Sequence, residues 1–128
     1  MNKTIYKPAL NAAIVFAALC VIIGAMGAHA LKGILSEELL NTYETAVRYQ
    51  FYHSLALAFA GVVYYVFPSV WVRRATWAFI TGIVLFSGSL YVLALTGLHL
   101  AVWVTPVGGV CFIAGWVLLA WASFQGPI

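Results

Sequence analysis

Long apolar stretches alternate with short polar breaks along the whole chain. Gly33, Pro68 and the pair Thr96-Gly97 interrupt the apolar pattern. The stretches between these breaks are each close to the about 20 residues that a helix needs to cross the hydrocarbon core of a bilayer. They predict four transmembrane helices, over residues 9–30, 49–67, 71–95 and 106–124. The sequence therefore predicts an all-α membrane protein, in which four transmembrane helices form a compact bundle and a single domain over residues 1–128.

The segment over residues 36–48 is amphipathic and precedes the second predicted span. Apolar residues recur at positions 35, 39, 43 and 47, and polar residues recur at 37, 41, 44 and 48. Residues three or four positions apart share one face of a helix. We expect this helix to lie along or just outside the membrane interface, leading into the second span. The pattern leaves open whether the two helices are continuous or turn near residues 48–52.

The third loop and the start of the fourth span have their own signals. Residues 98–104 are apolar except for His99, so we expect them to lie in the interface. Thr105-Pro106 predicts the beginning of the fourth span, because a capping hydroxyl followed by proline is a favourable helix start.

Composition excludes a water-soluble fold. Hydrophobic residues make up 65% of the chain and charged residues only 7%, whereas soluble domains carry about 25% charged residues. The net charge of +3 comes without a basic run, so we expect no nucleic acid partner. The expected partner is the lipid bilayer, and a homo-oligomer or a membrane-protein partner is compatible with the sequence. Cys20 and Cys111 lie inside apolar runs and indicate buried thiols.

The distribution of basic residues predicts the orientation. Lys3 and Lys7 precede the first span, and Arg73 and Arg74 lie between the second and third. Two spans separate these sites, so they share one side of the membrane. The positive-inside rule places that side in the cytoplasm. We therefore predict a multi-pass protein of the bacterial inner membrane with both termini cytoplasmic. The first apolar stretch is too long for a signal peptide and is expected to be retained.

Small residues near the end of the first span predict a helix-packing face. Gly24, Gly27 and Ala28 stand at positions i, i+3 and i+4. Small residues at this spacing let two helix backbones approach closely in lipid. We expect these three residues to contact either the second span or another copy of the chain.

Polar residues form a candidate cluster near the predicted outer interface. Ionisable groups at membrane depth are rare, and they raise a functional hypothesis by default. We expect a network with Arg48 as its centre, in which Glu44 and Arg48 point outward and Gln50 and His53 point inward. A purely structural role, as a solvated ion pair and satisfied histidines, is the alternative. The candidate residues are His29, Glu44, Arg48, Gln50, His53, Ser87, Ser89 and Tyr91.

Candidate chemistry is sparse. Motifs of nucleophilic hydrolases, zinc proteases and phosphate-binding loops do not occur, so we expect no catalytic residue, no metal site and no cofactor. The sequence favours a non-enzymatic accessory or interaction component of the membrane. A subunit of an oligomeric small-solute transporter or channel is the first alternative. A redox component is the second, with a quinone or with a haem held between His29 and His53.

Four ordered blocks of the sequence resemble a known family. These blocks are GAMGAHAL at 24–31, ETAVRYQFYH at 44–53, FSGSLY at 86–91, and TPVGG at 105–109 with Gly115-Trp116. They look like the signature of the domain-of-unknown-function 423 family, also called uncharacterised protein family 0382. That family comprises small bacterial inner-membrane proteins and is similar to a small mitochondrial transmembrane protein of animals. The resemblance implies a four-span membrane protein with no settled biochemical activity.

Overall fold

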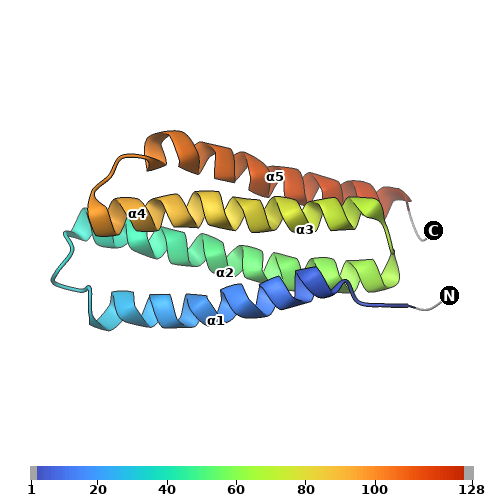
Figure 1. The fold of residues 1–128 in the computed structure, drawn as a ribbon, viewed down its shortest axis with the longest axis horizontal. Coiled ribbons are helices and arrows are strands. Elements are labelled where there is room, and N and C mark those ends of the chain that lie inside the picture. The colour runs from blue at the N-terminus through green and yellow to red at the C-terminus, as the bar shows by residue number, and fades with distance from the viewer. Residues whose placement is uncertain (1–2, 126–128) are drawn as a thin grey trace.

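The computed structural model describes residues 3–125, and its named elements are all helices. Helix α3 (Val70–Gly82), the π-helix η1 (Ile83–Ser87) and helix α4 (Gly88–Thr96) follow one another without interruption and form one rod (Figure 1). Three helical rods are long and apolar enough to cross a membrane, namely residues 7–29, 70–96 and 101–125. The elements are α1 (Lys7–His29), α2 (Glu37–Val66), α3 (Val70–Gly82), the π-helix η1 (Ile83–Ser87), α4 (Gly88–Thr96) and α5 (Ala101–Gln125). The predicted all-helical membrane class is thus confirmed.

The rods run antiparallel to their sequence neighbours (Figure 1). Helix α1 packs against α2, and α5 packs against α3 and η1. The two pairs are joined by contacts of α2 with α3, η1 and α4. Both ends of the described chain lie at the same end of the bundle, beside the connection from α2 to α3 (Figure 1). Helix α2 therefore packs between α1 and the rod formed by α3, η1 and α4, and α5 packs on the other side of that rod.

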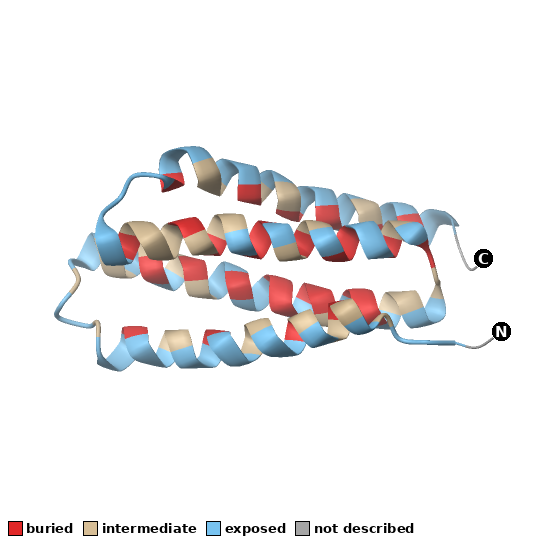
Figure 2. Ribbon diagram, viewed as in Figure 1, coloured by how far each residue is buried: buried red, intermediate tan, exposed pale blue. Residues whose placement is uncertain are grey.

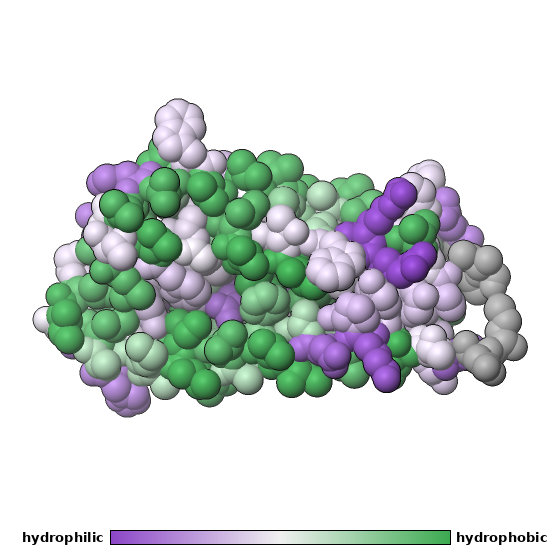
Figure 3. All heavy atoms as spheres, viewed as in Figure 1, coloured by the Kyte–Doolittle hydropathy of each residue, from purple (hydrophilic) through white to green (hydrophobic). Residues whose placement is uncertain are grey.

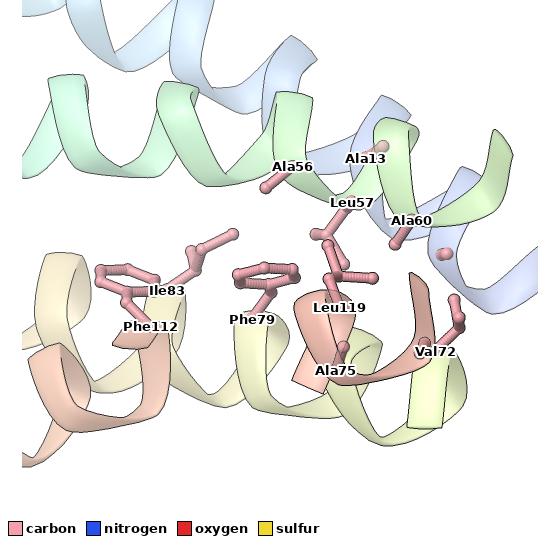
Figure 4. Close-up of a cluster of buried hydrophobic side chains, with 12 residues drawn as sticks. Ala13, Ala56, Leu57, Ala60, Val72, Ala75, Phe79, Ile83, Phe112 and Leu119 are labelled. Carbon is pink, nitrogen blue, oxygen red and sulfur yellow. The ribbon is translucent and has the colours of Figure 1, made fainter. Parts of the chain in front are cut away.

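Small apolar residues bring the helices close together in the core. Ala56 and Ala60 of α2 face Ala75 and Phe79 of α3 across the cluster in Figure 4. The outward faces carry most of the exposed positions (Figure 2), and many of these are large hydrophobic side chains such as Val21 and Ile113. Large apolar side chains on the outside suit a lipid surrounding and not water.

Glycines provide space for aromatic rings between α3 and α5. A Cβ atom on Gly115 would lie 2.5 Å from Cε1 of Phe79, and one on Gly82 would meet the ring of Phe112. A Cβ on Gly108 would meet the backbone of Phe86. These approaches are closer than real Cβ contacts, so a larger residue at any of the three glycines would push α5 away.

The amphipathic segment is the first part of α2 and not a separate surface helix. Helix α2 runs without a break from Glu37 to Val66, and Ser36 caps it by accepting a hydrogen bond from the Leu39 N–H at 3.2 Å. Its apolar side packs on α1, where a Cβ on Gly24 would lie 3.4 Å from Cγ1 of Val47. The structure thus decides the alternative that the sequence leaves open, since the amphipathic segment and the second predicted span form one continuous helix.

Helix α5 begins earlier than predicted. It starts at Ala101 and includes Pro106, whereas Thr105-Pro106 predicted the start. A turn at His99 and Leu100 provides acceptors for the N–H groups of Val102 and Trp103. Ala101 is buried, so the additional turn lets it pack on the bundle. Pro106 is the sixth residue of α5, and because it has no N–H the Val102 carbonyl lacks its usual i+4 donor.

Candidate functional site: a buried polar cluster

Gln50 is the centre of a polar cluster that joins three helices. Its Nε2 donates to the Phe16 carbonyl of α1 at 2.9 Å, and its Oε1 accepts from the Tyr91 hydroxyl of α4 at 2.7 Å. The Ser54 hydroxyl donates to the Gln50 backbone carbonyl. Gln50 is 3% exposed. Because Phe16 lies in the middle part of α1, this cluster is at mid-depth of the bundle.

The π-helix η1 places further hydroxyl groups beside this centre. Ser87 ends η1, and its Oγ donates to the Ala46 carbonyl of α2 at 2.7 Å. The next hydroxyl, that of Ser89, shares a hydrogen bond with Thr105 of α5. A π-helix adds one residue to a turn and is frequent at functional sites. Here it directs Ser87 toward α2 while Phe86 lies against Gly108 of α5.

Tyr43 and Cys20 link α1 and α2 between the level of Gln50 and the C-terminal end of α1. The Tyr43 hydroxyl donates to the Ile23 carbonyl, and the Cys20 Sγ donates to the Val47 carbonyl at 3.1 Å. The ring of Tyr43 meets the edge of the Tyr91 ring, with the centroids 5.5 Å apart. Tyr43 therefore continues the cluster from Gln50 and Tyr91 toward the end of α1.

His53 lies one turn beyond Gln50 and belongs to a different contact, with α5. Its Nδ1–H donates to the Tyr49 carbonyl at 2.8 Å, and its Nε2 accepts from the Trp116 Nε1–H at 3.3 Å. The imidazole stacks on the Phe112 ring with centroids 3.6 Å apart. These partners define a neutral imidazole with its proton on Nδ1. Both ring nitrogens are already in use.

The structure brings together only part of the predicted cluster. Gln50 and Tyr91 are bonded directly, and Ser87 lies beside them on the same helical interface. Ser89 bonds to α5 instead. His29 is exposed at the end of α1, and His99 is exposed in the third loop. The predicted outer position of the cluster is wrong because the continuous α2 places Gln50 beside Phe16, far below the end of α1.

This register also removes the geometric basis of a haem between His29 and His53. Phe16 is level with Gln50, and His29 is about 20 Å further along α1 at 1.5 Å per residue. His53 stacks on Phe112 and bonds to Trp116 on the other side of α2. The two histidines therefore do not face each other across a cavity.

Arg48 is not the centre of the network. Its guanidinium donates to Thr45 Oγ1 at 3.2 Å, and both Arg48 and Glu44 are exposed. Across residues 3–125 no ion pair joins the two side chains, although they stand one turn apart. Arg48 faces outward because its neighbours Val47 and Gln50 occupy the contacts with α1. The predicted assignment of Glu44 and Arg48 to an outward face is nevertheless what the structure shows.

The predicted packing residues lie near α2 to different extents. A Cβ on Gly27 would lie 2.6 Å from Cε1 of Tyr43, and one on Gly24 would lie 3.4 Å from Cγ1 of Val47. Ala28 is exposed. Gly27 thus makes room for the Tyr43 ring, while Gly24 is in ordinary contact.

The sequence pattern does not indicate that Tyr43, Trp116 and Thr105 take part in polar contacts. The pattern places Tyr43 on an apolar face, although a hydroxyl in an apolar stripe needs an acceptor when it is buried. Trp116 carries the same signal, since an indole N–H needs a partner in a low-dielectric surrounding. The pair Thr105-Pro106 predicts a helix cap, and only the earlier start of α5 makes the Thr105 hydroxyl available to Ser89.

The buried polar groups satisfy one another within the chain. Across residues 3–125 no buried side-chain nitrogen or oxygen lacks a hydrogen-bond partner. In the same part of the chain, no group of three His, Cys, Asp or Glu residues is placed to hold a metal ion. The cluster can fix the relative positions of the helices, and its hydrogen-bonding capacity is used in doing so.

Comparison with known proteins identifies the family. A family model described as "Protein of unknown function (DUF423)" matches residues 23–109. The chain belongs to the domain-of-unknown-function 423 family. The matched region of this family includes the cluster residues from Tyr43 to Tyr91 and Thr105. The resemblance of the four sequence blocks is thereby confirmed.

Relatives of this family come from distant bacteria. The chain is 44% identical to UPF0382 membrane protein SH2409 of Staphylococcus haemolyticus over 88% of this chain and 94% of the relative. It is 39% identical to UPF0382 membrane protein YwdK of Bacillus subtilis, over 85% and 89% of the two chains. A UPF0382 membrane protein of Haemophilus influenzae is 39% identical over 83% and 85%. No solved structure matches the chain. The names agree with a membrane protein of unknown function.

Proposed function

We propose that this chain is a closed four-span bundle of the bacterial inner membrane that acts as a non-enzymatic accessory or interaction component. One observation carries the proposal. Within residues 3–125, the buried polar side chains form their hydrogen bonds with one another and with helix backbones. A transport path or a reaction site needs polar groups that are available to a solute or substrate. A closed bundle acts through its outer surface instead.

The crossing of the membrane by α2 is part of this proposal. Helix α2 has 30 residues and lies alongside α1. At 1.5 Å per residue it is about 45 Å long, which exceeds the about 30 Å of the hydrocarbon core. Its polar residues Gln50, His53 and Ser54 are buried inside the bundle and do not face lipid. They therefore add little to the free-energy cost of placing α2 in the membrane. An even number of spans also suits the location of both described ends at one end of the bundle (Figure 1).

The charges support the cytoplasmic location of the termini. Lys3, Lys7, Arg73 and Arg74 belong to the end that carries the termini, whereas Lys32 lies near Glu37 and Glu38 at the other end. Figure 3 shows apolar residues over much of one face and hydrophilic side chains mainly toward the ends, most densely toward the termini. An excess of basic residues favours the cytoplasmic side.

Reporter fusions test the crossing. A fusion after Gly33 should report the periplasm, and fusions after Pro68 and Gln125 should both report the cytoplasm. The pair Gly33 and Pro68 decides whether α2 crosses, because these residues flank it. Finding the two on the same side would refute the four-span arrangement.

Thiol accessibility tests the closed interior. In a background with Cys20→Ala and Cys111→Ala, Ser87→Cys should resist a membrane-impermeant thiol reagent applied to either side of membrane vesicles. Ser36→Cys, at the exposed start of α2, provides the reactive control. Rapid labelling of Ser87→Cys would indicate a water-filled path through the bundle and favour the transport alternative.

A further inference from the structure

Two opposite charges are exposed on one lateral face of the bundle. Glu44 and Arg48 lie on the outer side of α2, next to α1, and both are exposed. Arg48 is about three turns, or about 16 Å, from the beginning of α2 at Glu37. Because α2 exceeds the about 30 Å of the hydrocarbon core by about 15 Å, a crossing centred on the core would place Arg48 about 9 Å inside it and Glu44 near its boundary. The homodimer proposal below rests on that crossing.

The same face is hollowed between α1 and α2. One hollow, of about 230 Å³, is lined by Gly24, Gly27 and Ala28 of α1 and by Glu44, Val47 and Arg48 of α2. A second hollow, of about 270 Å³, adjoins it and is also lined by Val47 and Arg48. Phe51 and Tyr52 form its far wall. Arg48 lies between the two hollows. We call this surface, from Gly24 and Ala28 to Tyr52, the α1–α2 face.

Lipid alone is a poor neighbour for the α1–α2 face. A charged side chain inside the hydrocarbon core is costly, by about 2.5–3.5 kcal/mol at the bilayer centre and by less toward the interface, and such residues normally pair with another charge. An anionic lipid headgroup would suit Arg48 but would repel Glu44. The Arg48 hydrogen bond goes to Thr45, a neutral hydroxyl, and leaves the positive charge unbalanced. A protein partner that presents both signs would balance both side chains.

A second copy of the chain presents both signs in the required arrangement. In a two-fold dimer, the same patch meets itself, so that residue i of one copy contacts residue j of the other and the reverse also holds. Glu44 of each copy then meets Arg48 of the other. The small residues of α1 permit close backbone approach at the same place. We propose that the α1–α2 face is a homodimer interface held by two reciprocal Glu44–Arg48 ion pairs.

Charge reversal with mixing tests the proposal and separates pairing between copies from pairing within one copy. Glu44→Arg makes the face doubly positive, and Arg48→Glu makes it doubly negative. Like charges at an interface cost several kcal/mol. Each variant alone should therefore self-associate about tenfold more weakly or worse than the unsubstituted chain. A mixture of the two variants should restore association, because opposite charges then meet across the interface.

Energy transfer between fluorescent proteins fused after Gln125 measures this association in phosphatidylethanolamine–phosphatidylglycerol vesicles over a range of lipid dilutions. The control variants Glu37→Arg and Arg73→Glu reverse charges at the two ends of the bundle, off the α1–α2 face, and should associate like the unsubstituted chain. Should either reversal fail to insert, Glu44→Gln and Arg48→Gln provide a milder pair. Both should weaken association, and their mixture should not restore it.

Three results would overturn the dimer. The unsubstituted chain could remain monomeric at all dilutions, the single reversals could associate as well as the unsubstituted chain, or association could require a different membrane protein. Reporter fusions on the same variants show separately whether α2 still crosses the membrane. A monomer with an unchanged fusion pattern would refute only the homodimer. A changed fusion pattern would refute the proposed four-span arrangement.

Discussion

The Tyr91 hydroxyl donates a 2.7 Å hydrogen bond to Oε1 of Gln50, and the other end of that same amide donates to the Phe16 carbonyl. One side chain thus connects α1, α2 and α4 at mid-depth of the bundle. An amide in a low-dielectric interior is costly when one of its groups lacks a partner. The contact therefore favours one register of the three helices over others that differ by a helical turn.

Removing this contact should show coupling between Gln50 and Tyr91. Tyr91→Phe should lower the free energy of unfolding by about 0.6–1.7 kcal/mol, the range for hydrogen bonds between membrane helices. Gln50→Leu should cost about 1–3 kcal/mol, because it leaves the Tyr91 hydroxyl without its acceptor. The double variant should lose less than the sum, since both changes remove the same bond. Reversible unfolding in micelles measures all three, with Tyr65→Phe on the exposed side of α2 as control. Strict additivity would contradict the coupling.

The small space at Gly27 should tolerate no additional atom. Gly27→Ala places a Cβ 2.6 Å from Cε1 of Tyr43, so the ring must move and its hydrogen bond to the Ile23 carbonyl weakens. We expect a loss of about 1–3 kcal/mol, as for overpacking in other cores. Gly88→Ala is the matched control, because nothing lies within 4 Å of its added Cβ and alanine favours a helix. Thermal unfolding in micelles compares them. Equal stability of the two variants would contradict the packing of Tyr43 on Gly27.

The Trp116 indole should determine the tautomer of His53. Trp116→Phe removes the donor to Nε2 and leaves that nitrogen without a partner beside Phe112. We expect a loss of about 1–3 kcal/mol in the free energy of unfolding. Nitrogen-15 NMR of labelled His53 should show a protonated Nδ1 and an accepting Nε2 in the unsubstituted protein. In the variant, the Nε2 resonance should shift. Trp121→Phe, at an exposed position of α5, should change neither quantity.

Loss of Arg48 should leave the stability of a single copy nearly unchanged. The side chain is exposed and its hydrogen bond goes to the neighbouring Thr45. Arg48→Ala should therefore change the free energy of unfolding of the diluted monomer by less than about 1 kcal/mol. A loss of several kcal/mol would indicate that Arg48 forms a buried pair inside the bundle. Unfolding measured at high micelle-to-protein ratio isolates the monomer from any association.

The sequence by itself determined the class of the protein and the approximate extent of its helices. Apolar runs of about 20 residues and a charged fraction of 7% leave few alternatives to membrane helices. Gly33, with φ of +93°, lies in the loop after α1, and Pro68 follows the C-cap of α2, as expected from their local effects on the backbone. Pro106 does not mark a helix start, because the burial of Ala101 and the hydrogen bond of Thr105 to Ser89 stabilise a longer α5. This stabilisation comes from contacts with other helices, which the local sequence pattern does not show.

Only the tertiary structure decided which polar residues meet. The sequence showed that Gln50, His53, Ser87 and Tyr91 are unusual in an apolar chain, but not that Gln50 lies level with Phe16. Sliding one helix along another by a turn preserves every apolar face, so periodicity does not define the register. The fit of Tyr43 onto Gly27 and the hydrogen bonds of Gln50 define it, because each requires matching atoms on two helices. The same register separates His29 from His53 and leaves Glu44 and Arg48 on the outer surface.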